Sequence, residues 1–152
     1  MRTLFLFTAL CLSSMVLRAA APTDRVEYMG GTRADIPVNN PGVIEVSDRI
    51  YFVFVSKQIR VKVPFDRINL LEYGQKVDRR YLAAVVISPL FMLAKKREHF
   101  LTVGFQDDEG QQQAMVFKVD KNAIRVALVT LEARTGQSVQ YQDDEARMAG
   151  KG

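Results

Sequence analysis

The segment from His99 to Thr135 restricts the possible folds more than any other part of the chain. Two runs rich in aromatic and β-branched residues, His99–Phe105 and Ala114–Val119, flank the polar turn Asp107–Gly110. Runs of this kind joined by a short loop that contains glycine predict a β-hairpin. After the hairpin, apolar residues recur at the i, i+3, i+4 and i+7 spacing of an amphipathic helix: Ile124, Ala127, Leu128 and Leu131.

Both ends of this predicted helix carry suitable capping residues. Asp120 can act as the N-cap, because its carboxylate can accept hydrogen bonds from the free amides of the first turn. Gly136 suits the position after the last turn, and Arg134 suits the negative end of the helix dipole. A helix of this length is marginal in water when alone, so its apolar face must dock on the strands upstream.

The upstream region contains short apolar or alternating runs bounded by turn residues. The run Ile50–Val55 is continuously apolar, which predicts burial on both faces, whereas Ile59–Val63 alternates apolar and basic residues and ends at Pro64. The other predicted strands are Arg25–Met29, Val43–Val46 and Ile68–Tyr73. Residues Arg33–Pro37 are a candidate extension of the first of these, Arg25–Met29. The sequence therefore predicts a mainly β fold, an antiparallel sandwich or barrel of about seven strands with one C-terminal helix.

The first 20 residues resemble a secretory signal peptide. Arg2 gives a short positive start, Leu4–Leu17 is an apolar run, and Ala19–Ala21 offers small residues for cleavage. We therefore expect export, to the periplasm or out of the cell. A leader kept as a membrane anchor is the alternative, although the run is shorter than the roughly 20 residues of a span. Cys11 is the only cysteine, so the mature domain would have no disulfide and no thiol chemistry.

The sequence divides into four predicted parts: residues 1–20 as signal peptide, 21–42 as an N-terminal strand and linker, 43–136 as the main domain, and 137–152 as a polar, disordered tail. A chain of 152 residues with 48% hydrophobic residues supports one domain with its own core. The balance of 21 basic and 17 acidic residues, with no basic stripe that contains aromatic residues, argues against a nucleic-acid partner.

The order of these elements, short antiparallel strands followed by one C-terminal helix, resembles the pleckstrin-homology-like (PH-like) fold. Val63–Ile68 is similar to a segment of bacterial members in which a proline-containing strand end leads into a strand that begins with isoleucine. Leu131–Gly136 is similar to the end of their helix, and the resemblance extends over residues 43–136. It implies a non-catalytic binding scaffold. Where lipid-binding members carry a basic motif, this chain has Gly30–Arg33, with one basic residue.

One segment does not fit a minimal barrel. Residues 82–94 are almost wholly apolar, with Ser88 and Pro89 as the interruption, and a basic run follows. Three interpretations stay open: a core segment that turns at Pro89, an interfacial loop inserted into lipid or a partner, or a buried first half with an exposed tip. The candidate residues for contact with a partner or a membrane are Leu90, Phe91, Met92, Leu93, Lys95, Lys96 and Arg97.

The sequence contains no combination of residues that indicates catalysis. His99 is the only histidine and has no cysteine to pair with, so a structural role is expected. Asp107–Glu109 lacks the alternating spacing and the distant glutamate of a calcium loop, and Gly30–Gly31 is not followed by the lysine or helix start of a phosphate loop. We therefore expect neither enzyme activity, nor a cofactor, nor a metal.

Two functional hypotheses follow, and a third is weak. The first is an exported module that binds a protein or peptide, with an extended peptide added as a strand to an open edge beside the C-terminal helix. The alternative is a peripheral membrane protein that uses the apolar segment 82–94 and the adjacent basic run on an anionic surface. A small hydrolase would need a nucleophile–base pair, which one histidine without cysteine does not supply.

Overall fold

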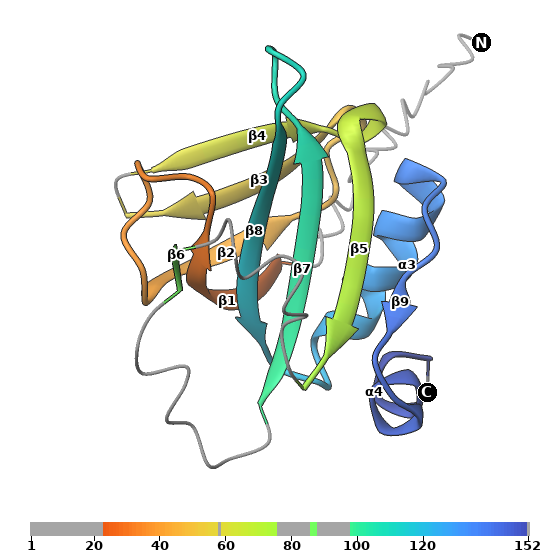
Figure 1. The fold of residues 1–152 in the computed structure, drawn as a ribbon. Helices are drawn as coiled ribbons and strands as arrows, with labels where there is room; N and C mark the ends of the chain where they lie inside the picture. The colour runs from red at the N-terminus through yellow and green to blue at the C-terminus, as the bar shows by residue number, and fades with distance from the viewer. Residues whose placement is uncertain (1–22, 58, 76–85, 88–97, 152) are drawn as a thin grey trace, which may run out of the picture.

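The computed structural model describes residues 23–57, 59–75, 86–87 and 98–151 (Figure 1). The predicted signal peptide lies outside the described residues. So do all seven predicted contact residues, which are Leu90, Phe91, Met92, Leu93, Lys95, Lys96 and Arg97, and most of the apolar segment 82–94. These predictions therefore stay predictions.

The described part of the chain forms one sheet of nine strands. Its order is β4-β3-β2-β1-β8-β7-β5-β9, and β6 pairs separately with β1. All pairings are antiparallel except that of β5 with β9. The strands are β1 (Thr23–Gly31), β2 (Asn40–Glu45), β3 (Tyr51–Ser56), β4 (Arg60–Pro64), β5 (Ile68–Gly74), β6 (Val86–Ile87), β7 (His99–Gln106), β8 (Gln112–Val119) and β9 (Gln140–Tyr141).

The sheet bends into two layers, which confirms the predicted mainly β, sandwich-like fold. In Figure 1, β3 and β4 run across the view while β8, β7 and β5 run up it, so the two halves cross steeply. Within the described residues no pairing joins β4 to β9, and the sheet is therefore open at both ends of its order. The seven strands expected from the sequence are all present, and β6 and β9 are additional.

The core lies between the two layers and contains a cluster of aromatic rings. Phe54 on β3 and Phe117 on β8 have ring centroids 5.1 Å apart, and Tyr28 on β1 lies 5.8 Å from Phe117. Periodicity accounts for this arrangement, because alternate residues of a strand face opposite sides of the sheet. In β4, Val61 and Val63 are buried while Arg60 and Lys62 are exposed, as the alternating pattern predicts.

Helix α3 (Ile124–Thr135) packs on the core with its predicted apolar face, since Ile124, Ala127, Leu128 and Leu131 are all fully buried. Its predicted N-cap is wrong. The carboxylate of Asp120 accepts from the amides of Asn122 (2.8 Å) and Ala123 (3.3 Å), so it caps the turn that precedes the helix. The predicted C-terminal end is confirmed, because Gly136 adopts a left-handed conformation with φ of 70°.

The end of the chain differs from the prediction of a disordered tail and a single helix. Residues 140–141 form β9, and a second helix, α4 (Asp144–Lys151), follows. This segment is folded because a few of its apolar residues are buried: Val139 and Ala146 are buried, although their neighbours in the chain are mostly polar. The candidate strand continuation over 33–37 is also absent: that segment is a loop in which Arg33 pairs with Asp35.

Candidate functional site

Strand β4 ends the sheet and leaves one side of its backbone unpaired. Within the described residues its only strand partner is β3. Beside this pairing, the amide of Phe65 donates to the carbonyl of Ile50 (2.9 Å) and that of Ser56 to Ile59 (2.8 Å). Because antiparallel ladder bonds alternate along a strand, the amides and carbonyls of Arg60 and Lys62 point away from β3. We call this outer backbone of Arg60–Pro64 the β4 edge.

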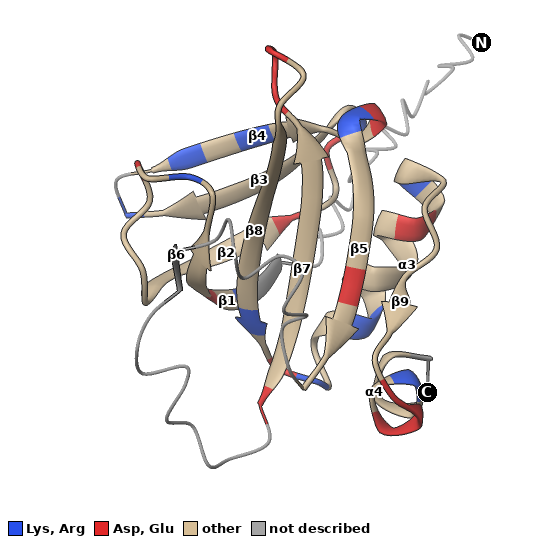
Figure 2. Cartoon of the chain, in the orientation of Figure 1, with Lys and Arg blue, Asp and Glu red and all other residues tan. Residues whose placement is uncertain are grey.

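Basic residues alternate with buried valines along β4 (Figure 2), and the side chains of Arg60 and Lys62 are exposed. The side chain of Arg60 lies 3.2 Å from Glu45, in an exposed ion pair, and the ammonium group of Lys62 lies 5.4 Å from the centroid of the Tyr51 ring. An exposed pair of this kind holds its partners weakly. The β4 edge therefore combines free backbone groups with positive charge.

A pocket of about 490 Å³ adjoins the Pro64 end of β4. The pocket lies between the start of β3, the end of β4, the short 3-10 helix η1 (Phe65–Arg67) and the last turn of α3. We call it the arginine pocket, because three arginines contribute to its wall. It is lined by Arg49, Ile50, Tyr51, Pro64, Phe65, Asp66, Arg67 and Arg134.

Two of the three arginines have no internal acceptor. Arg67 is ion-paired with Asp108. Among the residues that the structure describes, no hydrogen bond or ion pair engages the side chains of Arg49 or Arg134, and the Arg134 guanidinium lies 5.9 Å from the centroid of the Phe65 ring. Beside the pocket, the pKa of Asp48 is lowered mainly by hydrogen bonds from two backbone amides, that of Ile50 first and that of Tyr51 second.

The edge that the sequence suggested for a peptide, the one beside the C-terminal helix, is largely taken. There β9 pairs in parallel with β5, at Glu72 with Gln140 and at Tyr73 with Tyr141. The amide of Gln142 also donates to the carbonyl of Tyr73 (3.3 Å). The chain thus covers this part of β5 with its own C-terminal segment, and the free edge lies at β4, whose end approaches α3 through the arginine pocket.

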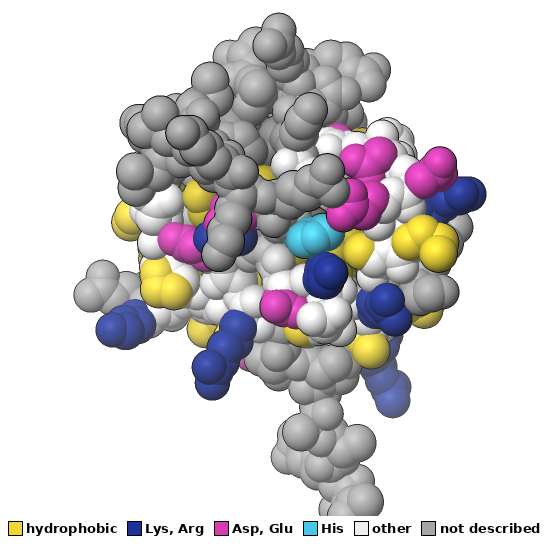
Figure 3. Space-filling model, turned by 90° about the horizontal axis from the view of Figure 1, so that it is seen from below, with side chains coloured by type: hydrophobic (Ala, Val, Ile, Leu, Met, Phe, Trp, Pro, Cys, Tyr) yellow, Lys and Arg dark blue, Asp and Glu magenta, His cyan; other side chains and the backbone are white. Residues whose placement is uncertain are grey.

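A second pocket, of about 270 Å³, lies where β7, α3 and α4 meet. Figure 3 shows the histidine of this pocket at the surface, with basic and acidic side chains around it. The His99 ring stacks on Tyr73 with centroids 5.6 Å apart, and burial is the main cause that lowers its pKa. Among the described residues, its buried Nδ1 atom has no hydrogen-bond partner. The pocket is lined by His99, Lys121, Asn122, Arg125, Glu145, Met148 and Ala149.

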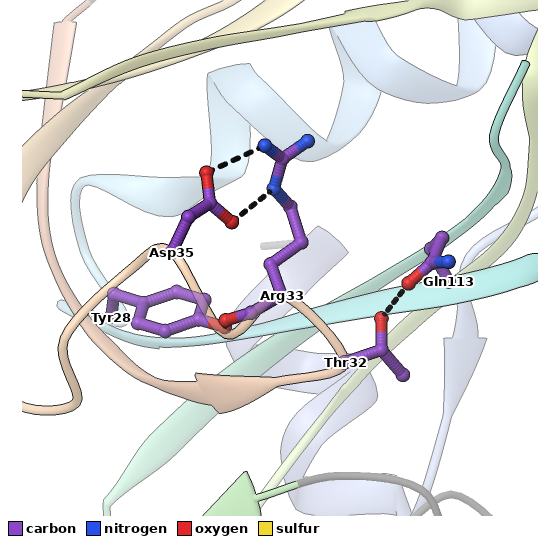
Figure 4. Close-up of polar contacts among 5 residues, drawn as sticks. All are labelled: Tyr28, Thr32, Arg33, Asp35 and Gln113. Atoms are coloured by element: carbon purple, nitrogen blue, oxygen red, sulfur yellow. Dashed lines mark hydrogen bonds and ion pairs between the residues drawn. The ribbon is translucent and has the colours of Figure 1, made fainter.

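A polar cluster at the end of β1 is structural (Figure 4). The Thr32 hydroxyl donates to Gln113 and accepts from the amide of Ala114 (3.0 Å), which fixes the loop onto β8. Arg33 binds Asp35 in a bidentate pair of 2.7 and 3.0 Å, and burial raises the pKa of Tyr28 to about 12. The one basic residue of Gly30–Arg33 is therefore already paired.

The arginine pocket was not found from the sequence. Arg49 belongs to a turn, and Arg134 was assigned to the helix dipole; no local pattern links residues so distant in the chain.

In the described residues, no group of histidine, cysteine, aspartate and glutamate side chains is arranged to hold a metal ion.

This chain has no match in two comparisons with known proteins. No family model matches it, and neither does any of the curated proteins. Among the described residues, no helix has the length and apolar character needed to cross a membrane.

Proposed function

We propose that this chain is a non-catalytic, exported binding module that takes an extended acidic segment of a peptide or protein along the β4 edge. The observation that carries the proposal is the backbone of Arg60 and Lys62 at the end of the sheet, which no other strand of the described residues pairs on its outer side. An exposed edge of this kind offers a ready template for one more strand. The resemblance to the PH-like scaffold supports a binding role, and the resemblance of residues 1–20 to a signal peptide supports export.

The positive charge of Arg60 and Lys62 on the β4 edge favours an acidic segment as the added strand. A strand added to β4 places alternate side chains on the outer face, next to Arg60 and Lys62, where acidic residues gain from cross-strand attraction. A second copy of β4 would bring like charges together, which disfavours pairing between two molecules of this protein. Because Pro64 has no amide to donate, the ladder ends at that residue.

The experiment uses a blocked octapeptide of alternating valine and glutamate. Two N-methylated forms are compared with it, one methylated at every valine and one at every glutamate. Only one of these sets of amides can face β4, because ladder bonds alternate. We expect one form to lose affinity roughly tenfold or more, from the loss of several backbone hydrogen bonds, and the other to bind like the parent.

Titrations monitored by NMR give the affinities. The variant Lys62→Glu tests whether the peptide binds at β4, and Lys121→Glu is the matched exposed control. The Lys62 variant should weaken binding and the Lys121 variant should not. Equal affinity of all three peptides, or equal loss for both methylated forms, would contradict strand addition.

The alternative from the sequence, an anionic membrane surface contacted through residues 90–93 and 95–97, concerns residues that the structure does not describe. Flotation of the protein with anionic and neutral vesicles tests it. Salt-sensitive binding to the anionic vesicles alone would support a membrane role.

A further inference from the structure

We infer that the arginine pocket binds a carboxylate group of the segment held on the β4 edge, between the guanidinium groups of Arg49 and Arg134. This inference rests on the proposed function and adds the chemical group that the module recognises. Pro64 connects the two features, since it ends β4 and lines the pocket. A segment paired with β4 would therefore have one of its ends near the pocket.

The donors in the pocket fit a carboxylate. A guanidinium group presents a planar fork of N–H donors that matches the two carboxylate oxygens, and such charged hydrogen bonds are about twice as strong as neutral ones. Within the described part of the chain, the side chains of Arg49 and Arg134 have no hydrogen-bond or ion-pair partner. Both forks are thus available to a ligand.

The carboxylates near the pocket offset only part of this positive charge: backbone hydrogen bonds first, and then the charges of Lys62 and Arg134, lower the pKa of Asp48. Asp48 accepts hydrogen bonds from the amides of Ile50 (2.8 Å) and Tyr51 (3.0 Å), which hold it in the turn. Asp108 is paired with Arg67, and Asp66 is exposed on the 3-10 helix. Three arginines therefore line a pocket that contains one carboxylate of its own, Asp66.

The lining of the pocket includes apolar side chains. Ile50 is 60% exposed, which is high for a large aliphatic side chain, and Phe65 is buried beneath Arg134. A guanidinium over an aromatic face is attracted by the ring, so Phe65 helps to hold Arg134 in place. The pocket consequently suits a carboxylate on a short apolar stem. Two groups of a peptide have this chemistry: a glutamate side chain and the terminal carboxylate of an apolar residue.

Three octapeptides of alternating serine and valine separate these sources. The first has both ends blocked and is neutral; the second is the same peptide with one glutamate in place of its last serine; the third is the neutral sequence with a free terminal carboxylate. We expect at least one acidic probe to bind roughly tenfold tighter than the neutral one. The probe with the higher affinity identifies the source of the carboxylate.

Arg49→Ala and Arg134→Lys test the pocket, with Lys121→Ala as an exposed control. Both pocket variants should reduce the affinity of the acidic probe toward that of the neutral probe and leave the neutral probe unchanged. Acidic probes that bind no tighter than the neutral one, or that are insensitive to both arginine variants, would overturn the inference while strand addition stands. Failure of all three probes and of the valine–glutamate octapeptide to bind would overturn the proposed function itself.

Discussion

At the scale of single residues, His99 is the clearest case in which burial changes chemistry. Its ring stacks on the fully buried Tyr73, and its buried Nδ1 atom has no hydrogen-bond partner in the described part of the chain. Burial first, and the charge of Lys121 second, lower the pKa of the imidazole from its ordinary value of 6.5. The folded protein therefore binds a proton at His99 less readily than the unfolded chain does.

This shift predicts the pH dependence of stability. Above pH 6.5 the ring is neutral in both states, and the folded state has no disadvantage; as the pH falls through 6.5 toward the lowered folded pKa, the unfolded chain gains the proton first and stability is lost. We expect the melting temperature to fall between pH 7.5 and pH 5.5, and His99→Phe, which keeps the stacking, to reduce that fall. An unchanged fall in the variant would show that other groups cause it.

At the scale of elements, local sequence patterns were sufficient for most of the fold. The alternation in Ile59–Val63 and the helical spacing of Ile124–Leu131 predicted which faces are buried, because each pattern reflects a periodicity of the backbone itself. The prediction for the tail, residues 137–152, was wrong because the same periodicity is missing there. Its buried residues are few and small, so no period stands out from its polar composition, although the folded chain buries Val139 and Ala146 completely or nearly so.

Helix α4 depends on that sparse burial, which gives a prediction for the element. Ala146 is fully buried, whereas Met148 on the same helix is 67% exposed. We expect Ala146→Glu to detach α4, because a carboxylate buried without a partner is costly, and Met148→Glu to have little effect. Amide hydrogen exchange reports the outcome, since the amide of Arg147 donates to Asp143 (3.0 Å) only while the helix is formed. Equal exchange at Arg147 in both variants would contradict this account.

At the scale of the whole molecule, the candidate site depends on long-range placement. The sequence predicted β4 with its exposed basic residues but not that β4 would end the sheet, because strand order is set by pairings between distant segments. The arginine pocket likewise needs α3 to cross the core and bring Arg134 to the turn that holds Arg49. Within the residues that the structure describes, β9 fills one edge and the other edge, at β4, is open.

That difference between the two edges supports a binding role for β4. Natural proteins commonly protect edge strands with lysine or proline, and β4 contains both Lys62 and Pro64. These residues prevent pairing with a second copy but still admit a strand of opposite charge. The central claim is therefore that the backbone of Arg60 and Lys62 receives an added acidic strand.

Amide hydrogen exchange, measured with and without the blocked valine–glutamate octapeptide, tests this claim most directly. The account predicts that the amides of Arg60 and Lys62 become protected when the peptide binds, while those of Val61 and Val63, which already face β3, change little. Binding that leaves Arg60 and Lys62 exchanging as in the free protein would contradict it.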